Sequence, residues 1–311
     1  MSKKLRFRDD GTFKIVQFSD VEIIDGEIGY GSKTMETMER VVQDERPDLI
    51  VFAGDVIASG ACKNHAQALC DAVSVAVGHG IPWAAVFGNH DSEVNITREQ
   101  LHFLQLSLPH NVAQPDPEGV NGVGNFVLNV SDNDGNTEAV LYFLDSGEYS
   151  PLSEVGLGGY DWIRRSQIAW YVDRSRERTM NNGGKPVPSL AFFHIPFPEY
   201  KELWDHHVCY GIKNDPISSP ALNSGLFTAM KEMGDIMGTF VGHDHDNDFW
   251  GTLHGIRLCY GRSTKYALTE GFVTGARVIK LTAGQRDFQT WIRLGDGSLV
   301  TEQPEHHPES R

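Results

Sequence analysis

Cysteine and long apolar runs are both scarce in this 311-residue sequence. Its four cysteines, Cys62, Cys70, Cys209 and Cys259, show no Cys-x-x-Cys spacing, which argues against a dense disulfide framework. No apolar run approaches the ~18 residues that a membrane-spanning helix needs, and no apolar segment of a secretory signal follows Met1. We therefore expect reduced thiols, a cytoplasmic location and no membrane association.

Basic residues are outnumbered, since 27 Lys and Arg stand against 42 Asp and Glu, which gives a net charge of −15. Nucleic-acid binding depends on Lys and Arg contacts to phosphate, so the composition makes a nucleic-acid partner unlikely. The 40% of hydrophobic residues is ordinary for a globular protein. We expect one domain over residues 1–311, with a core from about 12 to 295, a charged lead-in and a frayed tail.

The stretch from Trp83 to Asp91 carries the clearest chemical signal. An apolar run from Ile81 to Phe87 is typical of a buried strand, and it ends at Gly88 in Asn89, His90 and Asp91. Open α/β sheets place their functional side chains at such carboxyl ends of strands. Asn supplies an amide oxygen and His a titratable nitrogen, while the Asp carboxylate could hold that His in one tautomer.

Four further strand-like runs end in the same way. All of the endings supply oxygen or imidazole donors that suit divalent metals. They are Asp20 and Glu22 after residues 13–19, Asp55 after 48–54, His194 after 189–193, and His243 and His245 after 236–242. Any one of them is also typical of a turn, but five together predict a metal site.

The remaining pattern predicts a sheet-rich α/β domain. Helical spacing or capping residues indicate helices at 34–45, 64–77, 95–106, 166–176 and 224–233, the third of them capped by Asn95 or Thr97. A hairpin of residues 125–130 and 138–144 is expected around the turn Asp132–Gly135. Residues 249–294 alternate as strands do, whereas 196–223 has the composition of a long irregular connection.

The ordered motifs resemble those of the calcineurin-like metallophosphoesterase superfamily. They read Asp-x-(His), Gly-Asp, Gly-Asn-His-Asp, His and Gly-His-x-His over residues 20–245. The strings Tyr142–Gly147, Phe193–Pro196 and Gly242–Phe249 look most like single-domain purple-acid-phosphatase-like proteins. The resemblance implies a four-layer α/β/β/α sandwich with a dinuclear centre that hydrolyses phosphate mono- or diesters by attack of a metal-activated hydroxide.

The resemblance also implies roles for individual residues. Asp55 would bridge two metal ions, one of which would also bind Asp20, Glu22 and His245, and the other Asn89, His194 and His243. His90, paired with Asp91, would be catalytic, and Asn89 and His90 would contact the substrate. For His90 and Asp91 the alternative is a purely structural turn pair.

Two positions depart from the family's pattern. Glu22 stands where the first motif usually has His, and it either binds metal or points away and leaves that site weak. A carboxylate there favours harder ions such as Mg²⁺, Mn²⁺ or Fe, although Zn also remains possible. Ala58 stands where purple enzymes place a tyrosine ligand, so no tyrosinate–iron colour is expected.

The substrate and the oligomeric state are left open. Three loops, 109–124, 147–161 and 196–223, would select a small phosphorylated substrate. Basic residues near them are few, which favours diesters or small organic phosphates: Arg164, Arg165, Lys201 and Lys213. Alternatives are a metal-binding regulatory protein that has lost turnover through Glu22, a nuclease of the same fold, and a purely structural protein.

Overall fold

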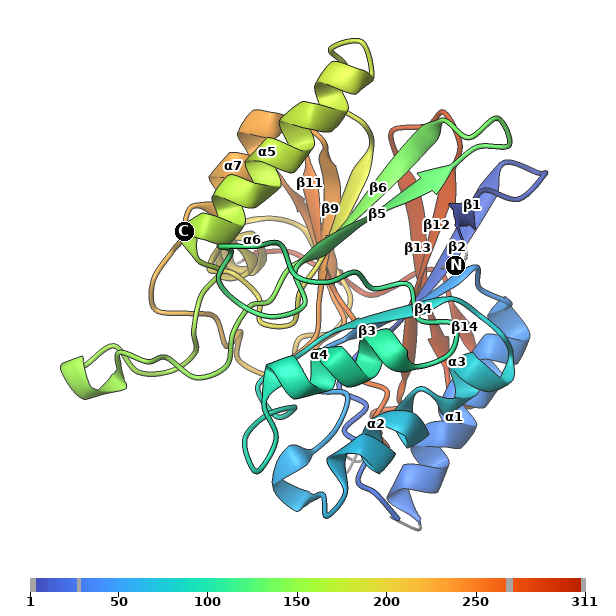
Figure 1. The fold of residues 1–311 in the computed structure, drawn as a ribbon, viewed down its shortest axis with the longest axis vertical. Helices are drawn as coiled ribbons and strands as arrows, with labels where there is room; N and C mark the ends of the chain where they lie inside the picture. The colour runs from blue at the N-terminus through green and yellow to red at the C-terminus, as the bar shows by residue number, and fades with distance from the viewer. Residues whose placement is uncertain (1–3, 27–28, 267–270, 309–311) are drawn as a thin grey trace.

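The computed structural model describes residues 4–26, 29–266 and 271–308 (Figure 1). Residues 1–3, 27–28, 267–270 and 309–311 lie outside the described residues. They include parts of the expected lead-in, of the strand region 249–294 and of the tail. Among the helices of the described chain, none has the length and apolar composition needed to cross a membrane.

Two sheets form the centre of the molecule. One has six strands in the spatial order β14 (Leu299–Val300), β13 (Phe288–Leu294), β12 (Gly275–Thr282), β2 (Thr12–Phe18), β3 (Leu49–Ala53) and β4 (Trp83–Val86). The other has nine, in the order β1 (Leu5–Arg6), β5 (Phe126–Ser131), β6 (Thr137–Phe143), β7 (Ser189–Phe192), β9 (Ile236–Val241), β11 (Ile256–Tyr260), β10 (Trp250–Leu253), β8 (Cys209–Tyr210) and β15 (Glu305–His306).

Helices cover the outer face of each sheet (Figure 1). The six-stranded sheet packs against α1 (Tyr30–Glu45), α2 (His65–Ala72), α3 (Ser74–Gly78) and α4 (Arg98–Ser107). The nine-stranded sheet packs against α5 (Arg165–Asn181), α6 (Glu199–His206) and α7 (Leu226–Met233). A third apolar cluster joins the two sheets to each other. The predicted four-layer α/β/β/α arrangement is therefore confirmed.

The central strands are parallel and buried on both faces. β2, β3 and β4 pair in parallel in one sheet, and β6, β7, β9 and β11 do so in the other. Every residue of β3, β4, β7 and β9 is buried, which explains why these strands appear in the sequence as continuous apolar runs. Their parallel pairing brings their carboxyl ends to common edges.

The prediction of a long irregular connection over 196–223 is wrong, because this segment contains α6 and β8. Tyr200 and Leu203, three residues apart, bury the inner face of α6 in the core. The expected frayed tail is also wrong for its described part, because β15 pairs with β8. The His306 ring stacks on Trp204 with 3.7 Å between ring centroids. The tail therefore belongs to the nine-stranded sheet.

Two smaller expectations also need correction. In the charged lead-in, Leu5 and Phe7 are buried, and β1 pairs in parallel with β5. The single helix expected over 64–77 is two helices, α2 and α3, which meet at Val73. The hairpin of β5 and β6 is as predicted, with Gly135 at φ 92° in its turn.

Candidate metal centre

The five strand endings converge on one place. β2, β3 and β4 of the six-stranded sheet end there, as do β7 and β9 of the nine-stranded sheet. We call the residues that they supply the strand-end cluster: Asp20, Glu22, Asp55, Asn89, His194, His243 and His245. All seven predicted metal ligands thus follow the carboxyl ends of parallel strands.

Hydrogen bonds across the cluster join the two sheets. The His243 backbone N–H donates to Asp20 Oδ1 over 2.9 Å, and the Gln17 amide donates to the Val241 carbonyl over 2.9 Å. His194 Nδ1 lies 2.8 Å from the Ala53 carbonyl oxygen. Since a carbonyl only accepts, Nδ1 carries the proton and Nε2 is left as the nitrogen that faces the cluster.

Two glycines allow this close approach. A Cβ at Gly54 would collide with the His194 ring, and Gly54 also has a φ of 86°. A Cβ at Gly88 would collide with the Asp55 carboxylate and the His194 ring. The Gly-Asp and Gly-Asn-His-Asp motifs therefore need glycine because other side chains occupy the space beside the backbone.

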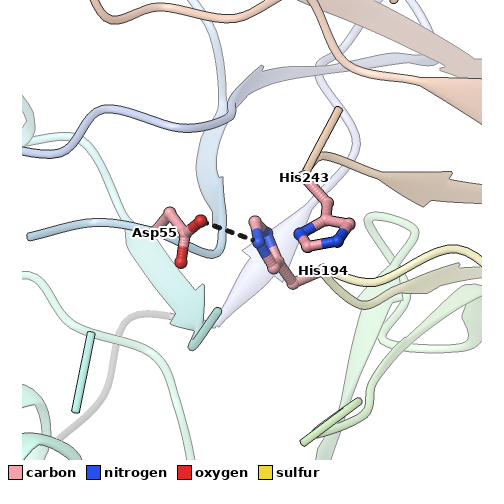
Figure 2. Close-up of side chains that lie close together, drawn as sticks. All are labelled: Asp55, His194 and His243. Carbon is pink, nitrogen blue, oxygen red and sulfur yellow. Dashed lines mark ion pairs between the residues drawn. The ribbon is translucent and has the colours of Figure 1, made fainter. Parts of the chain in front are cut away.

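Asp55 lies at the centre of the cluster, where its side chain faces the His194 ring (Figure 2). Its Oδ1 accepts a hydrogen bond from the His90 backbone N–H over 2.8 Å. Its Oδ2 lies 3.0 Å from His194 Nε2, yet neither atom has a hydrogen-bond partner within residues 4–26, 29–266 and 271–308. A buried carboxylate oxygen and a buried imidazole nitrogen at this distance, without hydrogen-bond geometry, are suited to binding the same cation.

Several buried oxygen and nitrogen atoms of the strand-end cluster form no hydrogen bond with any residue that the structure describes. Leaving buried polar atoms unpaired costs about 1–3 kcal/mol each, so their concentration in one place indicates an external partner. These atoms are Glu22 Oε1, Asp55 Oδ2, Asn89 Oδ1, His194 Nε2 and His243 Nε2. Carboxylate oxygens, an amide oxygen and imidazole nitrogens together fit Mg²⁺, Mn²⁺, Fe or Zn²⁺.

The donor atoms fall into three groups, all of which contain Asp55. In each group the ligand atoms lie within 4.8 Å of one another. The groups are Asp55, His194 and His243; Asp20, Asp55 and His245; and Glu22, Asp55 and His90. Each of the first two groups contains three of the four residues of one ligand set that the resemblance implies, with Asp55 shared between them. Glu22, which the resemblance implies beside Asp20 and His245, is grouped with Asp55 and His90.

Charges within the cluster shift the pKa values of its histidines in opposite directions. Burial acts to lower the pKa of His194, but the Asp55 carboxylate and its contact with the ring raise that pKa to about 9. Burial, followed by the His194 charge, lowers the pKa of His243 to about 3. His243 is therefore neutral at pH 7, and a metal ion that binds His194 must displace a proton.

The predicted pairing of His90 with Asp91 is wrong. The buried Asp91 carboxylate accepts hydrogen bonds from the backbone N–H groups of Val56, Ile57 and Gly88, at 2.7–2.9 Å. His90 Nδ1 lies instead 3.1 Å from Glu93 Oε1. Asp91 thus holds the turns after β3 and β4 in place, because its two oxygens point into the protein. Glu93 was overlooked, although its spacing three residues after His90 was visible in the sequence.

Arg98 is a second residue that the sequence did not single out. It is buried at the start of α4 and donates to Gly88 O over 2.6 Å, Asp145 Oδ1 over 2.9 Å and Glu148 Oε1 over 2.9 Å. The positive charge of Arg98 therefore fixes the Gly-Asn-His-Asp turn against the loop after β6. Asp145, at the end of the β6 segment, acts through Arg98.

A cavity of about 280 Å³ opens over the cluster. It is lined by Asn89, His90, Tyr160, Asp215, Pro216, Ser218, His243, Asp244 and His245. Two of the three loops expected to select substrate, 147–161 and 196–223, thus reach it. The Tyr160 ring packs edge-on against His243, with 4.2 Å between centroids. No Lys or Arg is among these lining residues.

Three of the four basic residues near the surrounding loops have partners outside the cavity. Arg164 pairs with Asp161, Lys201 pairs with Asp205, and the Lys213 ammonium lies over the Trp204 ring. A cation that does contact the cluster is Lys265, whose Nζ lies 2.5 Å from Glu22 Oε2. Lys265 follows β11 and belongs to no motif, so no sequence pattern indicated its role.

The chain has clear relatives among known proteins. A family model described as calcineurin-like phosphoesterase matches residues 13–247. "Probable inactive purple acid phosphatase 29" of Arabidopsis thaliana is 34% identical over 96% of this chain and 86% of its own length. "Phosphatase DCR2" of Saccharomyces cerevisiae is 31% identical over 94% of this chain and 55% of its own length.

The fold has a solved counterpart as well. The crystal structure of a dimetal phosphatase from Danio rerio superposes with a TM-score of 0.61 and 15% identity. The match covers 89% of this chain and 98% of the other.

Proposed function

Because this chain belongs to the calcineurin-like phosphoesterase family, we propose that it hydrolyses phosphate esters at a two-cation centre formed by the strand-end cluster. The observation that carries this proposal is the set of five buried donor atoms without hydrogen bonds around Asp55. The dimetal phosphatase with the same fold supports a count of two cations.

Each cation would have four protein ligands. Asp20, Glu22, Asp55 and His245 would hold the first, and Asp55, Asn89, His194 and His243 would hold the second. When bound, two such ions supply Lewis acidity and lower the pKa of water enough to provide a nucleophile at neutral pH. Mn, Fe, Mg and Zn all fit this mixed oxygen and nitrogen set.

His90 has a position suited to proton transfer. His90 lines the cavity and its Nδ1 faces Glu93, so Nε2 is left to donate a proton to the leaving-group oxygen. The pKa of His90 is raised above its ordinary value, because the charges of Asp55 and Glu93 outweigh the opposing effect of burial. The protonated form that a general acid needs is thereby stabilised.

The cavity favours a small substrate of low negative charge. Its volume of about 280 Å³ suits a small ester, and its lining contains Asp215 and Asp244 but no Lys or Arg. A dianionic monoester would gain from a basic clamp, which this lining does not offer. We therefore favour small phosphodiesters over phosphomonoesters.

The main alternative is a metal-binding regulatory protein without turnover. The Arabidopsis relative is called probably inactive, and Glu22 replaces the usual His of the first motif. A nuclease of the same fold is disfavoured by the net charge of −15 and by the acidic cavity lining.

The test measures hydrolysis of bis(p-nitrophenyl) phosphate and p-nitrophenyl phosphate together with bound metal. Wild type should hold two cations and prefer the diester. Asp55→Asn should lose bound metal and roughly 10³-fold in kcat/KM, since it removes the shared ligand. Two bound cations without hydrolysis of either compound would favour the regulatory alternative. Salt-sensitive cleavage of single-stranded DNA would favour a nuclease.

A further inference from the structure

Glu22 divides its two carboxylate oxygens between two neighbours. Only 9% of the residue is exposed. Its Oε2 accepts a hydrogen bond from Lys265 Nζ over 2.5 Å. Its Oε1 lies 3.1 Å from His245 Nε2 and has no hydrogen bond. One oxygen therefore faces the strand-end cluster while the other is held by an ammonium group.

The backbone fixes Lys265 beside the cluster. The segment after β11 runs along the end of β2, where Ser263 forms a bridge with Ser19. The Lys265 backbone N–H donates to the Asp20 carbonyl over 3.0 Å. Lys265 thus contacts Asp20 through its backbone and Glu22 through its side chain.

Three carboxylates, those of Asp20, Glu22 and Asp55, are buried together at the first cation site. Three negative charges confined in a poorly solvated space repel one another and bind divalent ions strongly. The ammonium of Lys265 cancels one of these charges. The resulting net charge equals that of two carboxylates with a neutral imidazole, the composition implied by an Asp-x-His motif.

We propose that Lys265 is the counter-charge of Glu22 and sets the affinity of the first site for divalent cations. This inference rests on the proposed function, since it concerns the same metal centre. Lys265 is a positioning and charge-balancing residue that touches neither cation nor substrate. With Lys265 present, a first site that contains Glu22 should bind divalent cations about as tightly as a site with His at that position and no lysine beside it.

Calorimetric titration of the metal-free protein with Mn²⁺ tests this proposal without reference to activity. Lys265→Met should tighten the first site about tenfold, because it removes a positive charge near the cation. Lys265→Arg keeps the charge and should stay within about threefold of wild type. Glu22→His should weaken the first site about tenfold, since Lys265 then stands without its carboxylate partner.

The double variant Glu22→His with Lys265→Met provides the decisive comparison. It restores the wild-type net charge and should return the first-site affinity to within about threefold of wild type. Circular dichroism of each variant verifies folding, and Lys265→Arg remains informative if Lys265→Met does not fold.

Unchanged or weaker Mn²⁺ binding by Lys265→Met would overturn the proposal, as would a double variant no tighter than Glu22→His. Wild type that binds two Mn²⁺ and follows the expected affinity order, but hydrolyses no ester, would refute the proposed function and leave this inference standing. Absence of first-site binding in every variant would overturn both.

Discussion

Four residues of the strand-end cluster have positive φ angles although none of them is glycine. Asp20, Glu22, Asp55 and His243 have φ of 53°, 46°, 49° and 81°. Such conformations cost of order 1–3 kcal/mol each for residues other than glycine. These strained residues lie together in the cluster. Their backbone conformations lower the stability of the fold but direct the four side chains toward a common point.

Substitution of the two carboxylates that follow His90, those of Asp91 and Glu93, should affect different properties of the protein. Glu93→Gln removes the charged partner of His90 Nδ1 and should lower kcat about tenfold, with both cations retained. Steady-state kinetics and metal analysis of the same sample measure this.

Asp91→Asn is the matched comparison for Glu93→Gln. It disturbs the carboxylate that binds three backbone N–H groups and should lower the free energy of unfolding by about 2 kcal/mol. A kcat of Asp91→Asn that falls at least about tenfold while the free energy of unfolding stays unchanged would contradict this purely structural role of Asp91.

At the scale of elements, Glu45 at the end of α1 joins that helix to the six-stranded sheet. Its carboxylate pairs with Arg293 of β13 over 2.7 Å and with Lys14 of β2 over 3.0 Å, and it accepts a bond from Trp291. Burial acts to raise the pKa of Glu45, but these partners outweigh it and lower the pKa below its ordinary value.

Glu45→Gln should therefore lower the free energy of unfolding by about 2 kcal/mol at pH 7. Since the folded-state pKa lies below the unfolded one, this stabilisation is present above the unfolded value near 4.5 and is lost as pH falls through the folded value. Urea unfolding at several pH values should show wild type and variant converge in acid. Glu36→Gln, at an exposed position of the same helix, should show little difference at any pH. Parallel pH curves for wild type and Glu45→Gln would contradict the assignment.

At the scale of the whole molecule, the strand-end cluster joins the two sheets. Asp20, Asp55 and Asn89 follow strands of the six-stranded sheet, whereas His194 and His243 follow strands of the nine-stranded sheet. A cation bound to both sets would connect the halves of the sandwich and stabilise the folded state.

Thermal unfolding with EDTA and with Mn²⁺ measures this stabilisation. At free Mn²⁺ about 100 times the dissociation constant, one site should contribute about 2.7 kcal/mol and raise Tm by roughly 4 °C. Asp55→Asn should show little of this increase. An equal increase in Asp55→Asn would mean that Mn²⁺ acts elsewhere.

The strand endings, and hence the residues of the cluster, can be predicted from the sequence alone. Apolar runs that end in Asp, Asn or His identify parallel strands, and parallel strands must bring those endings to shared edges. The turn of the β5–β6 hairpin and the start of α4 were also predictable, because local backbone chemistry determines turns and helix caps. Of the two residues that could cap α4, the structure places Thr97 at the cap.

Contacts between side chains far apart in the sequence depend on the tertiary packing and could not be predicted. Lys265 reaches Glu22 across 243 positions of sequence, and Arg98 joins two loops, because packing of β11 and α4 places them there. Likewise β8 and β15 become strands only through pairing with each other and with β10. Strand pairing and ion pairs of this kind depend on long-range contacts that leave no periodic pattern in the chain.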